Sequence, residues 1–163
     1  MSKACQRRID GSSAAFRCDR RKALTLPLVL VFITVTAGRG RAQTAADMDA
    51  RLDSLFGSHA PYRAFLDQLK QAVASGDKKA VASLVAYPLR TKLAGVNRTV
   101  QSSARFIAMY DAIMTDKVRA AVEKQTYATL FANAEGVSIG DGAIWFSAID
   151  TQDTIRIIAI NGS

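Results

Sequence analysis

Tyr110 and Asp111 place a phenol beside a carboxyl group, and these residue types are suited to acid–base chemistry. In an apolar pocket, such a pair can stabilise an oxyanion or act as a general base. Asp141 could add a second carboxylate, although its position before Gly142 is typical of a turn. The side chains predicted to share a pocket, and so to form the candidate ligand-binding set, are Tyr62, Tyr87, Tyr110, Asp111 and Trp145.

The helical pattern around Tyr110 argues against a shared catalytic role. Neighbouring helical residues point about 100° apart, so Tyr110 and Asp111 cannot both face one cavity. Tyr110 lies on the predicted core stripe, which favours packing or a structural hydrogen bond, and Asp111 is expected in solvent or bound to the Tyr87-Pro88 loop. Trp145 suits either the core or a ligand platform, because one indole can supply much of the contact energy of a binding site.

Metal, cofactor and nucleophile chemistry have little support in this sequence. His59 is the only histidine, and it stands in a polar turn. Gly136, Gly140 and Gly142 fit turns better than a phosphate-binding loop. No serine stands in a nucleophile-elbow context. The sequence therefore predicts no catalytic residue, no metal site and no cofactor.

Residues 1–42 are predicted to be a secretory signal segment that is removed from the mature chain. Arg20, Arg21 and Lys22 precede an apolar run over residues 23–37, and the small-x-small site at 40–42 follows. Fifteen helical residues span about 23 Å, short of a hydrocarbon core of about 30 Å, so a cleaved signal fits better than a retained anchor. The arginine pair leaves a twin-arginine export route open beside the general secretory one.

This segment carries most of the net charge of +8. It holds nine basic and two acidic side chains, which leaves 13 basic and 12 acidic side chains in residues 43–163. A nearly neutral body lacks the electropositive surface that nucleic acid binding requires. Cys5 and Cys18 also lie in the segment, so the mature chain would hold no disulfide. We predict a periplasmic or secreted protein that meets a membrane only through its signal segment.

The spacing of apolar residues predicts helices first and a β-meander last, within a single domain at residues 43–163. The predicted helices cover 44–56, 61–75, 77–86 and a stretch from Ser102 or Ser103 that restarts at Thr115, with one more turn at 126–131. The predicted strands cover 89–93, 96–100, a hairpin over 135–146 and a last strand at 154–160. This order predicts an α+β fold with N-terminal helices packed on a curved antiparallel sheet.

Several ordered blocks of the sequence carry a family resemblance. They are Gly76-Asp77, Tyr87-Pro88-Leu89, Phe106-x-x-x-Tyr110-Asp111, Leu130-Phe131-x-Asn133 and Gly136-Val137-x-Ile139-Gly140-x-Gly142-x-Ile144-Trp145. Together they resemble a group of small exported bacterial proteins of largely unknown function. At the level of the fold, the layout is similar to the cystatin-like or nuclear-transport-factor-like α+β cone. That resemblance implies a pocket between helices and a bent sheet, but it does not decide function.

Three functions are compatible with these patterns. The first is a non-catalytic exported module that binds a small ligand, a cell-wall component or another protein. The second is a small pocket enzyme of isomerase, dehydratase or hydrolase type, and the third is a purely structural role. A set of basic residues could face an anionic partner or form an ordinary solvated surface. These residues are Arg90, Lys92, Arg98 and Arg105.

Overall fold

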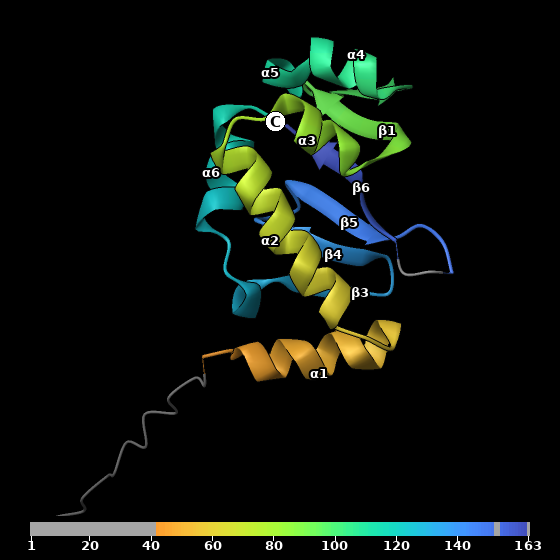
Figure 1. Cartoon of the computed structure of the whole chain (residues 1–163). Coiled ribbons are helices and arrows are strands. Elements are labelled where there is room, and N and C mark those ends of the chain that lie inside the picture. The colour runs from red at the N-terminus through yellow and green to blue at the C-terminus, as the bar shows by residue number, and fades with distance from the viewer. Residues whose placement is uncertain (1–41, 152–153, 163) are drawn as a thin grey trace, which may run out of the picture. The chain divides into compact units, whose positions relative to one another are not determined.

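The computed structural model describes residues 42–151 and 154–162, which form three helices, a β-hairpin, further helices and a C-terminal group of strands (Figure 1). The predicted signal segment lies outside these residues except for Ala42. None of the described helices is long and apolar enough to cross a bilayer. The helices are α1 (Ala45–Phe56), α2 (Ala60–Ala74), α3 (Lys78–Ser83), α4 (Ser103–Ala108), α5 (Tyr110–Ile113), α6 (Asp116–Lys124) and the 3₁₀ helix η1 (Tyr127–Thr129).

The strands form one six-stranded sheet in the order β2-β1-β6-β5-β4-β3. All neighbouring strands are antiparallel except β1 and β6, which run parallel. The predicted α+β fold is therefore confirmed, and the sheet is mixed rather than wholly antiparallel. The strands are β1 (Val85–Leu93), β2 (Val96–Val100), β3 (Phe131–Asn133), β4 (Gly136–Ile139), β5 (Ile144–Ala148) and β6 (Ile155–Asn161).

Side-chain caps fix where the helices begin. Thr44 and Asp47 form a reciprocal capping box on α1, and Asp77 accepts hydrogen bonds from the first backbone amides of α3. Ser102 and Thr115 cap α4 and α6 in the same way. These side chains satisfy amides that have no partner inside the helix, so helix starts could be predicted from the sequence.

Three predicted element boundaries were wrong. The third helix ends at Ser83, because Val85 enters the sheet opposite Ile157 and is buried there. The predicted helix after Ser102 breaks at Met109, whose backbone angles (φ −109°, ψ 11°) separate α4 from α5. The predicted helical turn at 126–131 shortens to η1, and Phe131 pairs with Ser138 as the first residue of β3.

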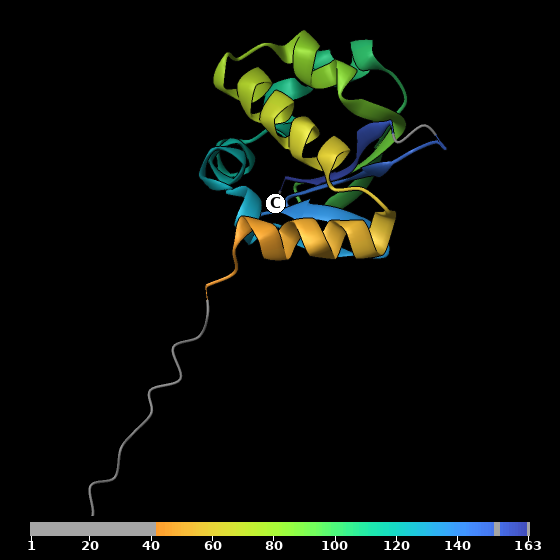
Figure 2. The same cartoon turned by 60° about the horizontal axis from the view of Figure 1, so that its bottom comes forward.

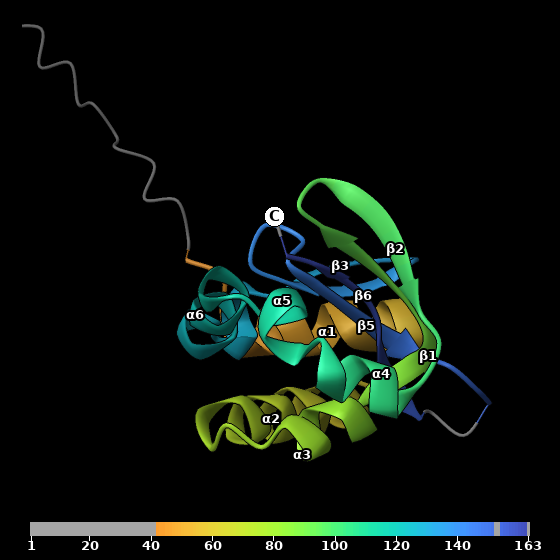
Figure 3. The same cartoon turned by 90° about the horizontal axis from the view of Figure 1, so that it is seen from above.

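One face of the sheet carries the core, and α2 and α3 lie on that side of the strands (Figures 1 and 3). The Phe146 ring lies 4.9 Å from the Phe65 ring of α2 and 6.3 Å from the Tyr62 ring, measured between centroids. The side chains on the opposite face are largely polar or charged. We call this side, which α2 and α3 do not cover, the open face. One cross-strand row of the core face is buried throughout: Ala132, Val137, Phe146, Ile157 and Val85.

The first helix is tied to the chain ahead of β3, and Figure 2 shows it in front of the strands. Met48 and Leu52 of α1 are fully buried. The Tyr127 hydroxyl of η1 donates to Asp49 at 2.7 Å, and the Arg63 guanidinium lies 4.7 Å from the centre of the Tyr127 ring. Burial, then the hydrogen bond to Asp49, then the charge of Asp49 raise the pKa of Tyr127 above its ordinary value.

Because the pKa of Tyr127 is raised, we predict that its contact with Asp49 of α1 stabilises the fold less at alkaline pH. Below the ordinary tyrosine pKa of about 10, Tyr127 is neutral in both states; above it, the unfolded chain loses the proton first, so stability falls with rising pH. Tyr127→Phe should lower the free energy of unfolding by about 1 kcal/mol near neutral pH. Between neutral and alkaline pH, the free energy of unfolding should then fall less for this variant than for wild type. Urea unfolding at about pH 8 and about pH 11 measures this difference. Equal alkaline losses in both proteins would contradict the assignment.

Candidate functional site

The structure does not bring all five candidate ligand-binding residues together. Tyr87 and Tyr110 both contact the Phe106 ring, and Asp111 adjoins them through Lys78, whereas Tyr62 and Trp145 lie elsewhere. Tyr62 is buried against Phe56 and Phe146 on the core face. Tyr87 donates its hydroxyl to Ala82 O at 3.0 Å. Their rings therefore serve the core and the α3–β1 junction rather than one shared pocket.

Tyr110 and Asp111 differ in burial, although both adjoin Lys78, whose Nζ lies 5.2 Å from the centre of the Tyr110 ring. The Tyr110 side chain is buried, and its ring stacks edge to face with Phe106 at 5.9 Å. Burial is the main cause that raises the pKa of this phenol. The Asp111 side chain is 76% exposed, and Lys78 Nζ lies 2.8 Å from its Oδ2. Asp111 thus lies largely in solvent and pairs with Lys78 of α3 instead of the Tyr87-Pro88 loop.

Trp145 lies on the open face, in a cross-strand row that the sheet register defines. Phe131 of β3 pairs with Ser138 of β4, which pairs with Trp145 of β5. Trp145 pairs with Ala159 of β6, and Ala159 pairs with Arg90 of β1. Directly opposed residues in a sheet point to the same side. The row therefore brings an aromatic pair and a cation together across five strands.

The β4–β5 turn holds the Trp145 indole close to the backbone. Gly142 has a φ of +82°, and a Cβ added there would lie 3.3 Å from the indole Nε1. Asn161 fixes the turn from β6, because its Nδ2 donates to Gly142 O at 2.7 Å and its backbone N donates to Ala143 O at 2.8 Å. On the other side, Gly140 N donates to the buried Gln125 Oε1 at 2.9 Å. These contacts restrict the position of Trp145 before any ligand arrives.

Three adjoining hollows border this row on the open face. The first has a volume of about 460 Å³ and is lined by Arg90, Trp145, Ala159 and Asn161, with Glu135 and Ile158. The second, of about 520 Å³, lies between the β4–β5 turn and α6 and shares Trp145 and Asn161. The third, of about 370 Å³, lies along the β1–β2 hairpin and shares Arg90, Ala159 and Asn161. The small Ala159 side chain thus forms the floor between Trp145 and Arg90.

The hollow above this floor has one basic lining residue, Arg90, and one acidic lining residue, Glu135. Arg90 and Lys92 of β1 are exposed on the open face, whereas Arg98 of β2 pairs with the buried Thr91 and points to the other side of the sheet. Among the residues that the structure describes, none of the three forms an ion pair. An unpaired guanidinium at the rim of a hollow is suited to a carboxylate or phosphate, which it can bind through two parallel hydrogen bonds.

Phe131 extends the apolar part of the row. Its side chain is 51% exposed, and its ring meets the Trp145 ring edge to face at 6.1 Å and 81°. The Arg51 guanidinium of α1 lies 5.8 Å from the centre of the Phe131 ring. Ser138 lies between the two aromatic residues in the register and is only 2% exposed. The result is an apolar end and a cationic end on one surface.

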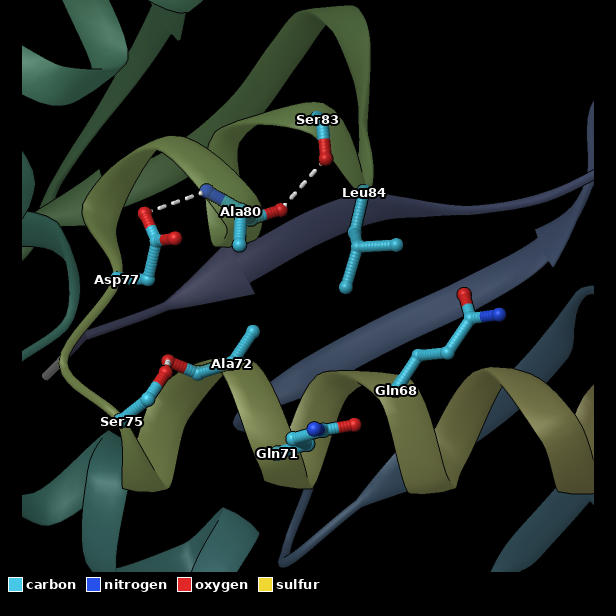
Figure 4. A pocket seen from close by; sticks show the side chains of 8 residues that line it. All are labelled: Gln68, Gln71, Ala72, Ser75, Asp77, Ala80, Ser83 and Leu84. Atoms are coloured by element: carbon cyan, nitrogen blue, oxygen red, sulfur yellow. Dashed lines mark hydrogen bonds between the residues drawn. The ribbon is translucent and has the colours of Figure 1, made fainter.

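Another hollow, of about 340 Å³, lies between α2 and α3 (Figure 4). Its hydroxyl and carboxyl groups already bond to the backbone: Ser75 Oγ donates to Ala72 O, Ser83 Oγ donates to Ala80 O, and Asp77 Oδ1 accepts from Ala80 N. Figure 4 shows these side chains directed along their own helices. The amides of Gln68 and Gln71 are the other polar side chains of this hollow, and its lining contains no arginine or lysine to match Arg90.

The described residues contain no cluster of three or more His, Cys, Asp or Glu side chains that could hold a metal ion. His59 lies between α1 and α2, where its Nδ1 is 2.8 Å from Asp53 Oδ1.

The sequence identified Trp145 and the basic residues but not their proximity. The alternation of Leu89 to Leu93 placed Arg90 and Lys92 on one face of a strand. Only the parallel pairing of β1 with β6 places Arg90 two strands from Trp145. No local pattern signals that pairing, because the two strands lie far apart in the sequence. Asn161 and Ala159 were missed for the same reason.

Comparisons with protein-family models, curated proteins and solved structures found no match to this chain.

Proposed function

We propose that this protein is an exported, non-catalytic binding module that holds an anionic ligand with a flat ring on the open face of its sheet. In this proposal, Trp145 contacts the ring, and Arg90 binds the carboxylate or phosphate. The observation that best supports this proposal is the cross-strand row, in which only Ala159 lies between Trp145 and Arg90. The export part rests on the signal pattern of residues 1–42.

The spacing of the row supports this arrangement. Neighbouring strands lie about 4.8 Å apart, so the Cα atoms of Trp145 and Arg90 are about 10 Å apart across Ala159. This span leaves room for one ring beside one anionic group, above the hollow of about 460 Å³. Tryptophan supplies a large apolar surface, and arginine supplies a planar pair of donors.

Binding of three small probes tests the proposal. Benzoate has both a ring and an anion, benzamide has the ring without the charge, and acetate has the anion without the ring. Calorimetry should show that benzoate binds most tightly. Arg90→Gln should raise its Kd about tenfold, which corresponds to the loss of about 1.4 kcal/mol from one charge-assisted contact.

Arg105→Gln is the matched control, because it removes an exposed cation from α4, away from the row. The Kd of benzoate for this variant should equal that of wild type. If both variants weaken benzoate equally, the effect is one of overall charge, and the proposed role of Arg90 is wrong. That role is also wrong if benzamide binds as tightly as benzoate.

A further inference from the structure

The two edges of the sheet differ in how they are covered. The β3 edge is three residues long and contacts α1. Arg51 of α1 donates from Nε to Ala132 O at 2.9 Å, and its Nη2 bonds the same carbonyl. A helix and a guanidinium thus protect this edge, which is a common defence against unwanted strand pairing.

The β2 edge is longer and more exposed. Val96, Asn97, Arg98 and Thr99 are all exposed, and only Val100 is buried. Within residues 42–151 and 154–162, no backbone hydrogen bond from outside the sheet reaches this strand. β2 therefore presents a free edge of the kind that can accept another strand.

The hairpin turn determines which β2 groups point outward. Ala94 and Gly95 have φ values of 49° and 80°, as a two-residue type I′ turn requires, and Leu93 pairs with Val96 across it. Residues that flank such a turn form a hydrogen-bonded pair, and hydrogen-bonded and non-hydrogen-bonded pairs then alternate. Asn97 and Thr99 therefore belong to non-hydrogen-bonded pairs, and their backbone N–H and C=O groups point away from β1.

The charge of the hairpin selects the partner. Residues 85–100, which form β1, β2 and their turn, contain three basic side chains and no Asp or Glu. Pairing of β2 with a second copy of itself about Arg98 would oppose two like charges, which destabilises a sheet. An acidic strand would instead place carboxylates beside Arg98 on one side of the sheet, or toward Arg90 and Lys92 on the other. Neither arginine makes an ion pair among the described residues.

We propose that the β2 edge binds an extended acidic peptide segment as a seventh strand. The peptide backbone pairs with the outward N–H and C=O groups of Asn97 and Thr99, and its carboxylates face the basic hairpin. Main-chain hydrogen bonds then supply affinity, and charge supplies selectivity. This proposal does not depend on ligand binding at Trp145, because the main-chain groups of Asn97 and Thr99 that pair with the peptide take no part in that site.

Three capped peptides of equal length test the proposal on the unaltered protein. One alternates glutamate with valine, one alternates lysine with valine, and one alternates glutamate with proline, which keeps the charge but cannot form a continuous ladder. The glutamate–valine peptide should bind and should protect the amides of Asn97 and Thr99 from hydrogen exchange. The other two should bind at least tenfold more weakly. Equal binding of the glutamate–proline peptide, or protection elsewhere in the domain, overturns the proposal.

Thr99→Pro gives a matched variant. Proline at this position removes an outward N–H while leaving the hydrogen bonds between β1 and β2 in place. Affinity for the glutamate–valine peptide should fall at least tenfold while the circular dichroism spectrum stays unchanged. Unchanged affinity in a folded variant overturns the proposal; if the variant does not fold, the peptide comparison on the unaltered protein decides. Concentration-dependent self-association through β2 in sedimentation would also overturn it, because a second copy would then be the occupant.

Discussion

Replacing Phe146 with alanine is expected to lower the free energy of unfolding by about 3–5 kcal/mol, the range for truncating a large buried aromatic side chain. Phe146 is fully buried in the centre of the sheet, where its ring contacts Phe65 and Tyr62 beneath α2. Truncation would leave a cavity between α2 and the strands, which cannot collapse without moving a helix. Urea unfolding followed by far-ultraviolet circular dichroism measures the loss.

Ser147→Ala is the matched control for this variant. Ser147 follows Phe146 on β5 and points to the open face, opposite Arg156. Its replacement should change stability by less than about 0.5 kcal/mol, the usual effect of a surface substitution. Similar losses in the two variants would mean that β5 does not separate a core face from an open face.

Gly136→Ala is expected to cost about 3–4 kcal/mol, because it combines backbone strain with a steric clash. Gly136 has a φ of +145°, and a Cβ at this position would lie 2.7 Å from the backbone carbonyl oxygen of Phe146. A backbone atom cannot move aside as a flexible side chain can, so β4 and β5 would have to separate locally. The midpoint of urea unfolding should fall accordingly.

Gly95→Ala controls for the strain alone. Gly95 has a φ of +80°, but a Cβ there would meet nothing within 4 Å. Its cost should be about 1–2 kcal/mol, the penalty for a left-handed L-residue without a clash. If Gly136→Ala costs no more than this control, the close approach of β4 and β5 is wrong.

The hairpin and the helix starts were predictable because local residues determine them. The pair Asp141-Gly142 between two apolar runs predicted the β4–β5 turn, and Asp77 predicted the start of α3. The parallel pairing of β1 with β6 was not predictable, since it depends on burying Val85 opposite Ile157, far along the chain. This pairing also shortened the third helix, because Val85 could not serve both elements.

The candidate site was predicted only in part, for a related reason. Trp145 was identified by residue type, but its chosen neighbours Tyr62 and Tyr110 lie in the core. Aromatic residues suit both cores and binding surfaces, so residue type alone cannot separate the two. The strand register decides which face each residue occupies, and a bulge shifts it between β5 and β6.

The most direct test of the open-face account is the nuclear magnetic resonance signal of the Trp145 indole N–H during a benzoate titration. The chain contains one tryptophan, so this signal has a single assignment. We expect it to shift together with the backbone amides of Ala159 and Arg90, while amides around Gln71 in the α2–α3 hollow stay fixed. Shifts confined to the α2–α3 hollow, with the indole signal unmoved, would contradict the account.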